Sequence, residues 1–368
     1  MNPIDALRRR LPLAILSFVA LQALASAADA ARCTVTLKAD GNTAAVQRAL
    51  EAPGARRPVV CLNPGIYGGA RLIATRSATM RRVGKGKVVL DAGARGRVLT
   101  ITEKDLDVRL EGLVLTNGDI EEGGGVAMLG ASHLTLVDTW LTGNRATRMG
   151  GAIYSQAGRI DLVRSRISSN YAAQGGALAA EGTARVTMRH TMVSDNRNEA
   201  GSNGPIWLED GVRLDFFHST LAYNVGHGIY LRPTPRGPSP TLLVESAVIM
   251  GAPDAIFVSR SKADSVEVYR SVLHGGIGFI SLDLASKRAI PRFNLTEQER
   301  YRPSKGSPAI ALGLCKNKGG KRDLAGRLRP KVCTAGALEA PPADVKTTLE
   351  LRRKRAALKK KDAEAPWW

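Results

Sequence analysis

Aromatic side chains are scarce in this chain. Phe, Trp and Tyr make up only 5% of its 368 residues, so few large side chains are available to fill a broad globular core. Glycine, with 38 residues, is more frequent than usual, which predicts many tight turns. A hydrophobic content of 44% excludes disorder as the main state. For a chain of this length, the composition favours one elongated repeat array over two globular domains.

Long apolar runs are missing as well, except near the N-terminus. Three arginines at 8–10 precede an apolar run at 11–24, which is followed by the small residues Ala-Ser-Ala at 25–27. This arrangement predicts a secretory signal peptide over 1–27, because about 14 apolar residues are fewer than the ~20 that span a bilayer. We therefore expect an exported protein, secreted or periplasmic and of Gram-negative type, without a transmembrane span.

The middle of the chain contains no cysteine. The four cysteines form two local groups near the ends of the folded region, and oxidising compartments permit disulfides. Of the three possible pairings, we favour the local one, Cys33 with Cys61 and Cys315 with Cys333. The sequence has no CxxC and no clustered His/Cys spacing, so we expect no metal site of that kind.

One motif recurs through the central part of the chain. LTLVDTWLTGN ends at Asn144, IDLVRSRISSN at Asn170, VTMRHTMVSDN at Asn196 and LDFFHSTLAYN at Asn224. The asparagines are 26, 26 and 28 residues apart. A looser copy, DVRLEGLVLTN, ends at Asn117, and two degenerate copies follow the last regular one. A fixed period of this length indicates a repeat architecture.

Apolar residues alternate within each copy, as Leu134 and Leu136 do, and a period of two is typical of strands. Each copy is too short to bury a core of its own and must stack on its neighbours. We predict a parallel β-solenoid with strands about 4.8 Å apart and the asparagines stacked at a bend. An immunoglobulin-like sandwich is the alternative, but it would not give the same phase in every copy.

The glycine pairs between the copies carry a resemblance to a known class. GGAI at 150–153 and GGAL at 175–178, with the xxN endings, resemble repeats of polymorphic outer-membrane proteins and related right-handed parallel β-helix proteins of the pectin-lyase-like superfamily. SPAIALG at 307–313, with DLAGRLRP and GALE after it, resembles the C-terminal segment of many secreted β-helix proteins. The resemblance implies an all-β, right-handed, single-stranded parallel β-helix.

The segment 42–69 resembles the beginning of these folds, where a short amphipathic helix containing Ala45, Val46, Ala49 and Leu50 caps the open end. A Pro-rich stretch at 232–240 is expected to form a loop. The expected order is a signal peptide (1–27), an N-terminal cap (28–57), β-helix turns (58–280), a closing region with the second disulfide (281–343), and a basic tail, helical or disordered (344–368).

Candidate catalytic residues lie on two neighbouring copies. The repeat places His190 next to His218, with Arg189 and Asp215 on the same outer face, a set that suits glycosidic-bond chemistry or uronate recognition. A solvated face with hydrogen-bonded histidines is the alternative. His227 stands in a GHG sequence that resembles a motif of polygalacturonase-type hydrolases. The other motifs of those enzymes (NTD, paired Asp, RIK) are absent, so a lyase or epimerase is favoured over a hydrolase.

Sugar binding without chemistry has its own candidates. Tyr154, Trp207 and Tyr230 follow the glycine turns, where they would either stack on sugar rings or fill corners. The net charge of +20 favours an anionic partner. The cations gather near both ends, at Arg71, Arg76, Arg81, Arg82, Lys85 and Lys87, and at Lys316, Lys318, Lys321, Arg322, Arg327, Arg329 and Lys331.

The sequence thus favours an exported surface or matrix protein that binds an acidic polysaccharide or another anionic cell-surface polymer. The alternative is a polysaccharide lyase, or another carbohydrate-active enzyme, acting on uronate-containing glycans. No cofactor is expected, except calcium if the lyase alternative holds. Nucleic acid is not an expected partner. The basic tail, which ends in Trp367 and Trp368, is a candidate for peripheral membrane contact.

Overall fold

The computed structural model describes most of the chain between 32 and 340. The described residues are 32–41, 43–199, 203–235, 237–259, 266–277, 282–294, 301–305, 307–310, 312–314, 322–329 and 332–340, with 344, 346, 348–350 and 353. The predicted signal peptide, Cys315 and almost all of the basic tail lie outside these residues. Among the described residues, no helix is long and apolar enough to cross a membrane.

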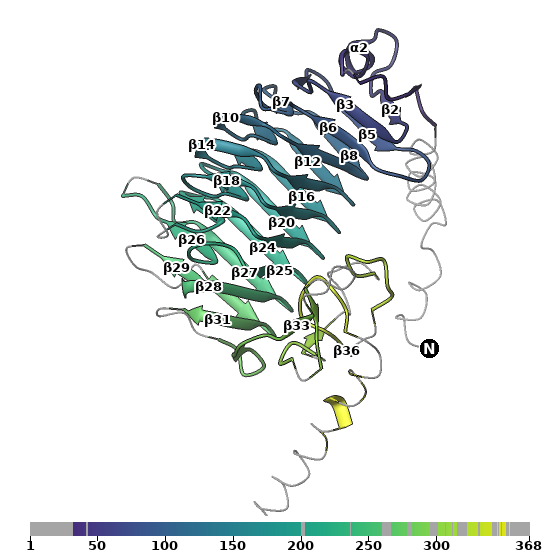
Figure 1. Ribbon diagram of the computed structural model, residues 1–368. Coiled ribbons are helices and arrows are strands. Elements are labelled where there is room, and N and C mark those ends of the chain that lie inside the picture. Colours follow the sequence, from purple (N-terminus) through teal and green to yellow (C-terminus); the bar gives the residue numbers. More distant parts are fainter. Residues whose placement is uncertain are drawn as a thin grey trace, which may run out of the picture.

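The chain coils into a parallel β-helix whose turns stack along one axis (Figure 1). Sheet A contains ten strands in the order β1 (Val35–Leu37), β2 (Val59–Leu62), β5 (Ala78–Arg82), β8 (Asp107–Glu111), β12 (His133–Val137), β16 (Arg159–Val163), β20 (Arg185–Arg189), β24 (Arg213–Phe217), β27 (Thr241–Glu245) and β30 (Val266–Tyr269). All its pairings are parallel, and each strand pairs with the equivalent strand of the next turn.

Sheets B and C form the other two long walls. Sheet B contains β3 (Gly65–Gly68), β6 (Val88–Asp91), β9 (Leu113–Thr116), β13 (Trp140–Thr142), β17 (Arg166–Ser168), β21 (Met192–Ser194), β25 (Thr220–Ala222), β28 (Val248–Asp254), β31 (Val272–Gly276) and β32 (Lys287–Arg288). Sheet C contains β4 (Leu72–Ala74), β7 (Leu99–Ile101), β11 (Val126–Met128), β15 (Ile153–Ser155), β19 (Leu178–Ala180), β23 (Ile206–Glu209), β26 (Ile229–Arg232) and β29 (Ile256–Val258). Short strands in the turns between sheets B and C form a fourth sheet, from β10 (Asp119–Glu122), β14 (Arg145–Met149), β18 (Tyr171–Ala172) and β22 (Arg197–Asn198).

The register places like residues above one another, so the core is a set of apolar ladders. Leu134 pairs with Val108 on one side and with Ile160 on the other, and all three are fully buried. Outward positions alternate with these, as a period of two requires. The expected parallel β-helix is confirmed.

The stacked asparagines are also confirmed. Asn144 Nδ2 donates to Asn170 Oδ1 at 3.0 Å, Asn170 to Asn196 at 2.9 Å, and Asn196 to Asn224 at 2.9 Å. Each oxygen also accepts the backbone N–H of the preceding asparagine. Asn117 is not a member of this ladder, because Gly118 pairs with the Asn144 side chain in its place. Asn117 takes the left-handed position before the ladder, with φ of 56°, so the sequence alignment of that copy was wrong by one residue.

A helix and a disulfide close the N-terminal end. Helix α2 (Ala44–Glu51) buries Val46, Ala49 and Leu50, and it ends before Ala52-Pro53, where proline disfavours further helix. Cys33 and Cys61 form a disulfide that joins the residues just before β1 to β2. Cys333 is disulfide-bonded as well, but its expected partner Cys315 lies outside the described residues. The capping helix and the first disulfide are thereby confirmed.

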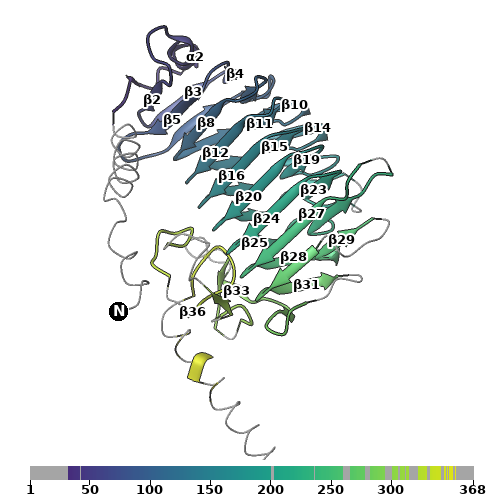
Figure 2. The same cartoon turned by 180° about the vertical axis from the view of Figure 1, so that it is seen from behind.

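The described residues within 282–340 are called the closing segment below; apart from β32, the last strand of sheet B, they lie along the outer face of sheet B (Figures 1 and 2). Val248 and Val272 pack against Ala309, Leu312 and Ala335. A second cluster joins Met192 to Tyr301, Ala337 and Leu338. The segment contains two antiparallel pairs, β33 (Phe293–Asn294) with β34 (Arg302–Pro303) and β35 (Gly313–Leu314) with β36 (Val332–Cys333).

Candidate functional site

The corner between sheets A and B is formed by one residue in each turn. Asp138, Arg164, His190 and His218 have φ values of 49°, 48°, 53° and 46°, which is the left-handed region that non-glycine residues seldom adopt. They occupy the same position, six residues before the ladder asparagine. A single left-handed residue reverses the chain here and turns its side chain outward, so these residues form a ridge along the molecule.

His190 and His218 stack on this ridge, as the repeat predicts. Their ring centroids are 5.3 Å apart and their planes differ by 15°. However, they are only 0% and 1% exposed, so the expectation that they lie on an accessible outer face is wrong. The closing segment covers them: Gly336 N–H donates to the backbone of Ser246, the next corner residue, and Arg329 acts electrostatically on His218.

A buried ionic network holds the closing segment together. Arg329 pairs with Glu339 at 3.3 Å and donates to the carbonyls of Thr334 and Gly336. Asp323 accepts the backbone N–H of Glu339. Burial raises the pKa of the Glu339 carboxyl, while the charge of Arg329 opposes that rise. The expectation that Arg329 belongs to a cationic surface is wrong, because its side chain is fully buried.

Arg189 and Asp215 remain on the outer face of sheet A, in different columns. Asp215 pairs in register with Thr187, whereas Arg189 pairs with Phe217. The guanidinium of Arg189 lies 5.4 Å from the centroid of the Phe217 ring, and Asp215 forms an ion pair with Arg213 at 3.0 Å. The structure therefore divides the expected set into a buried histidine pair and two residues of an open face.

The outer face of sheet A carries side chains of both charges along its length. His133 Nε2 lies 2.9 Å from Asp161, and Arg159 binds the same carboxylate at 2.8 Å. Burial acts to raise the pKa of Asp161, but the hydrogen bonds from Arg159 and His133 lower it below its usual value. In this middle part of the sheet, Arg159 and Arg213 thus already have carboxylate partners on their own strands.

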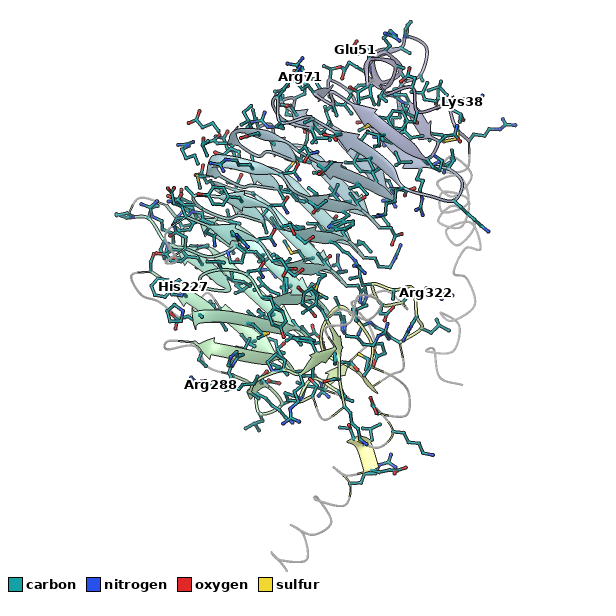
Figure 3. All side chains as sticks on the ribbon, in the orientation of Figure 1. Lys38, Glu51, Arg71, His227, Arg288 and Arg322 are labelled. Atoms are coloured by element: carbon teal, nitrogen blue, oxygen red, sulfur yellow. A yellow bond between two sulfur atoms is a disulfide. The ribbon has the colours of Figure 1, made fainter. Side chains whose placement is uncertain are left out.

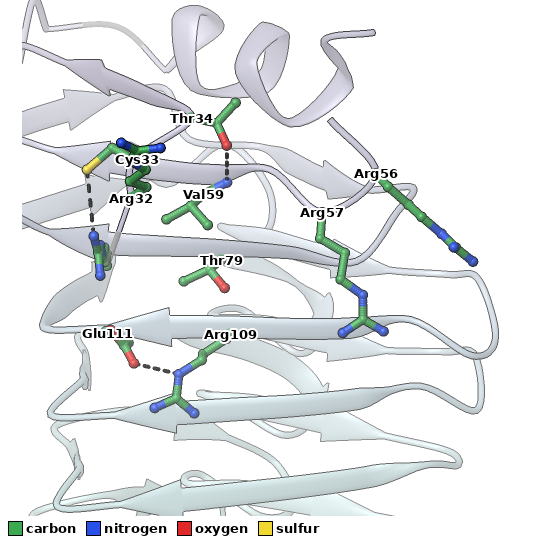
Figure 4. A pocket seen from close by; sticks show the side chains of 10 residues that line it. Arg32, Cys33, Thr34, Arg56, Arg57, Val59, Thr79, Arg109 and Glu111 are labelled. Atoms are coloured by element: carbon green, nitrogen blue, oxygen red, sulfur yellow. Dashed lines mark hydrogen bonds and ion pairs between the residues drawn. The ribbon is translucent and has the colours of Figure 1, made fainter. Parts of the chain in front are cut away.

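The N-terminal end of the same face has an excess of positive charge. A groove of about 690 Å³ is lined by five arginines and one glutamate, namely Arg32, Arg56, Arg57, Arg81, Arg109 and Glu111 (Figure 4). Arg109 pairs with Glu111, and Arg57 lies 3.5 Å from Asp107. Within the described ranges, Arg32 and Arg56 have no ion-pair partner. Of these arginines, only Arg81 was expected from the sequence: Arg32, Arg56 and Arg57 come from segments outside the repeat, and Arg109 belongs to its loosest copy.

Aromatic side chains form a column on the outer face of sheet C. Trp207 stacks on Tyr230, with centroids 4.4 Å apart and planes 7° apart, and Tyr230 lies 4.9 Å from Phe257. Trp207 is 3% exposed, while Tyr230 and Phe257 are half-buried. Sequence reasoning missed Phe257 because its copy of the motif is degenerate. The short apolar run Ile-Phe-Val at 256–258, which follows the Tyr230 strand, is the signal that could have found it.

Tyr154 belongs to the same column but is fully buried, so it is not available as a glycan-stacking residue, and the other of the two sequence-based alternatives applies to it. Met149 from β14 packs against Tyr154, and the hydroxyl of Tyr154 donates to Glu181 at 2.9 Å. Burial is the main cause that raises the pKa of Tyr154 to about 12. Tyr154 therefore fills a corner of the fold.

His227, which is only 6% exposed, lies beside the half-buried end of the aromatic column. Its Nδ1 is 3.1 Å from Asp254 Oδ2, and its ring lies 4.4 Å from the centroid of Phe257. Burial lowers the pKa of His227, against the opposite effect of Asp254, so the imidazole is neutral at neutral pH and able to accept a proton. In Figure 3, His227 lies at one lateral edge of the β-helix and Arg322, in the closing segment, at the other.

Metal-binding geometry is not found in the part of the chain that the structure describes. No three His, Cys, Asp or Glu side chains gather there in a way that would hold a metal ion.

Four of the cations expected at the C-terminal end, Lys316, Lys318, Lys321 and Lys331, lie outside the described residues.

Comparison with known proteins gives similarity of structure alone. No family model matches the chain, and no curated protein matches it in sequence. Among solved structures, pectate lyase Pel9A is similar with a TM-score of 0.49 at 12% identity, over 80% of this chain and 90% of that one. YbhC of Escherichia coli gives a TM-score of 0.35 at 12% identity, over 65% of this chain and 76% of that one. Both TM-scores lie below 0.5, so neither likeness bears on activity or substrate.

Proposed function

We propose that this protein is an exported β-helix protein that binds an acidic polysaccharide, or another anionic cell-surface polymer, in the arginine-lined groove of sheet A. The observation that carries the proposal is the charge of that groove, where five arginines face a single glutamate. Guanidinium groups recognise carboxylate and sulfate through paired hydrogen bonds. A linear anionic chain would lie across the strands, which repeat about every 4.8 Å.

The distribution of charge on this face favours the N-terminal end of sheet A, and not its middle, as the binding site. Arg159 and Arg213 already have carboxylate partners on their own strands, so they offer little net charge to a polymer. Arg32 and Arg56 are exposed and lie at the groove. A ligand carboxylate that meets them would supply the counter-charge that the protein lacks there.

The test is the binding of the mature protein to polygalacturonate, measured by titration calorimetry at several salt concentrations. Neutral dextran is the ligand control. We expect binding to polygalacturonate that weakens as salt is added, because exposed charges are screened. Replacing Arg32 and Arg56 by Ala should lower the affinity about tenfold, since each exposed contact contributes up to about 1 kcal/mol.

The matched control removes the same charge elsewhere. Arg185 on β20 and Arg288 on β32 are exposed and do not line the groove of sheet A, so the variant R185A/R288A should retain the affinity of the wild type. Equal losses in both double variants would show that net charge alone attracts the polymer, and the groove would then have no specific role.

A second candidate function rests on His227. Its contact with Asp254, next to the half-buried rings of Tyr230 and Phe257, supports a carbohydrate-active enzyme at sheet C. In a lyase, the neutral imidazole would accept the proton from C5 of a uronate while the bond from C4 to the leaving oxygen breaks, which leaves an unsaturated sugar. Calcium belongs to this candidate only, as an ion to be added in the assay.

The lyase candidate is tested by ultraviolet absorption during incubation with polyuronates, with and without calcium. Release of unsaturated product by the wild type, its loss in His227→Gln and its retention in His274→Gln would support it. His274 lies on β31 and is half-buried. A wild type that binds polygalacturonate but releases no product would leave binding as the function.

A further inference from the structure

A second, smaller groove lies at the corner where sheet A turns into sheet B. Its volume is about 240 Å³. Four basic side chains line it, and they are Arg82, Lys87, Arg164 and Arg166. Asp138 is the carboxylate that lines the same groove, and Arg164 already holds it through two hydrogen bonds of 2.9 and 2.8 Å. The remaining three cations give the groove a net positive charge.

Trp140 supplies an aromatic wall to this groove. It lies half-buried on the outer face of β13, and its Nε1 donates to Ser168 Oγ at 2.7 Å, which fixes the orientation of the indole. Lys87 Nζ lies 5.7 Å from the centroid of the ring. A fixed indole next to cations suits a sugar acid, because the apolar face of the pyranose stacks on the ring while its carboxylate meets the cations.

Gly112 opens the groove at its corner. Neighbouring turns place the side chains of Asp138 and Arg164 on the ridge, but Gly112 leaves that position empty and has φ of 69°. A Cβ atom at Gly112 would lie 3.3 Å from the Cβ and from the Nε of Arg82. Any side chain at this position would therefore crowd Arg82 and narrow the groove.

The two grooves meet at this corner. Arg81 and Glu111 line the groove of sheet A, and the residues that follow them in the chain, Arg82 and Gly112, line the corner groove. We propose that the corner groove binds a further carboxylate-bearing sugar unit of the same polysaccharide chain, stacked on Trp140 and paired with Arg82, Lys87 or Arg166. This inference rests on the proposed function, and it adds that the bound polysaccharide chain bends around the ridge.

The experiment uses galacturonate oligomers of increasing length, titrated into the mature protein by calorimetry and followed by Trp fluorescence. In the wild type, affinity should rise with oligomer length until a single chain reaches both grooves, because the second contact becomes intramolecular. In Trp140→Ala and in Gly112→Asn, short oligomers should bind as in the wild type, while long oligomers should lose about tenfold in affinity. Asn is chosen because it tolerates left-handed backbone.

The outcomes separate this inference from the proposed function. If the wild type binds no oligomer of any length, the proposed function fails. If R32A/R56A weakens binding but W140A, G112N and R166A all match the wild type at every length, the corner groove is overturned and the groove of sheet A stands. Circular dichroism and thermal midpoints check folding, and with three variants of different kinds one unfolded variant does not end the test. Arg185→Ala is the matched control and should bind as the wild type at every length.

Discussion

The imidazole rings of His190 and His218 stack on consecutive turns of the left-handed corner, with 5.3 Å between their centroids. The closing segment covers them, and the positive charge of its Arg329 acts on His218. Burial, followed by the nearby Arg329 and His190, lowers the pKa of His218 to about 3. The site that the repeat pattern assigned to catalysis is therefore a joint between the β-helix and its closing segment, and it has to remain uncharged.

Acid should weaken the fold through His218. An unfolded histidine takes up a proton near pH 6.5, whereas the folded His218 does so only near 3. The stabilising contribution is thus complete above about pH 6.5 and falls by about 1.4 kcal/mol for each pH unit of acidification below that value. Urea unfolding measured from about pH 7 down to about pH 4 should show this slope.

The variant His218→Asn isolates the effect, because Asn accepts the left-handed conformation. Its free energy of unfolding should depend on pH less steeply, by about one proton. His274→Asn, at a half-buried position of β31, should keep the slope of the wild type. An unchanged slope in His218→Asn would show that the histidine does not report on the joint.

The repeat could be predicted because each turn has the same physical problem to solve. Leu134 and Ile160 recur in register because both must face the core, and Asn144 and Asn170 recur because each satisfies the backbone of its neighbour. The burial of His190 could not be predicted, since its cover comes from residues more than a hundred positions later in the chain. The periodic pattern says nothing of such contacts.

The candidate site was harder to predict than the fold for the same reason. Arg32, Arg56 and Arg57 lie outside the repeat, and only the stacking of β1, β2 and β5 brings them to one groove. Tyr154 has the sequence context of Tyr230, but Met149, from the short strand β14 just before it in the same turn, packs against it. The local sequence therefore predicts in which column of the sheet an aromatic side chain lies, but it does not predict how exposed that side chain is.

The asparagine ladder should be a major source of stability. Asn170 accepts from Asn144 and donates to Asn196 and to the carbonyl of Leu141. Asn170→Ala would leave these buried groups without partners, at a cost of about 2 to 4 kcal/mol in the free energy of unfolding. Chemical denaturation followed by circular dichroism measures the loss.

The matched control for the ladder is Asn117→Gly. Asn117 is exposed, has φ of 56° and bonds to Asp91 at 3.0 Å. Glycine adopts this backbone without strain, so the stability should change by less than about 1 kcal/mol. Similar losses in the two variants would contradict the view that the ladder, and not the asparagine content, stabilises the turns.

The disulfide between Cys33 and Cys61 should affect both stability and binding. It closes a loop with a sequence separation of 28, and a loop of that length contributes about 3 to 4 kcal/mol in the chain-entropy model. Cys33 and its neighbours Arg32 and Thr34 line the groove of sheet A. The variant C33S/C61S should therefore unfold at lower urea concentration and bind polygalacturonate more weakly.

Two comparisons interpret the disulfide variant. Binding is measured well below the unfolding midpoint, so that only the position of β1 differs, and Asn117→Gly provides a folded reference. Weaker binding is expected to appear in the folded state. If the folded C33S/C61S protein binds polygalacturonate as tightly as the wild type, the residues just before β1 are not part of the binding groove.

The ion pair between Arg329 and Glu339 should keep the closing segment on sheet B. Glu339→Gln removes the charge that compensates the buried guanidinium, and breaking a buried pair in this way costs about 3 to 5 kcal/mol. Because the apolar surface of Val248 and Val272 lies beneath the segment, its release should increase the fluorescence of a hydrophobic dye and open sites for limited proteolysis between 282 and 340. The β-helix itself, held by its own ladders, should keep its circular dichroism. Glu267→Gln, at an exposed position of β30, is the control and should behave as the wild type; loss of the whole β-helix signal in Glu339→Gln would mean that the segment and the turns unfold as one unit.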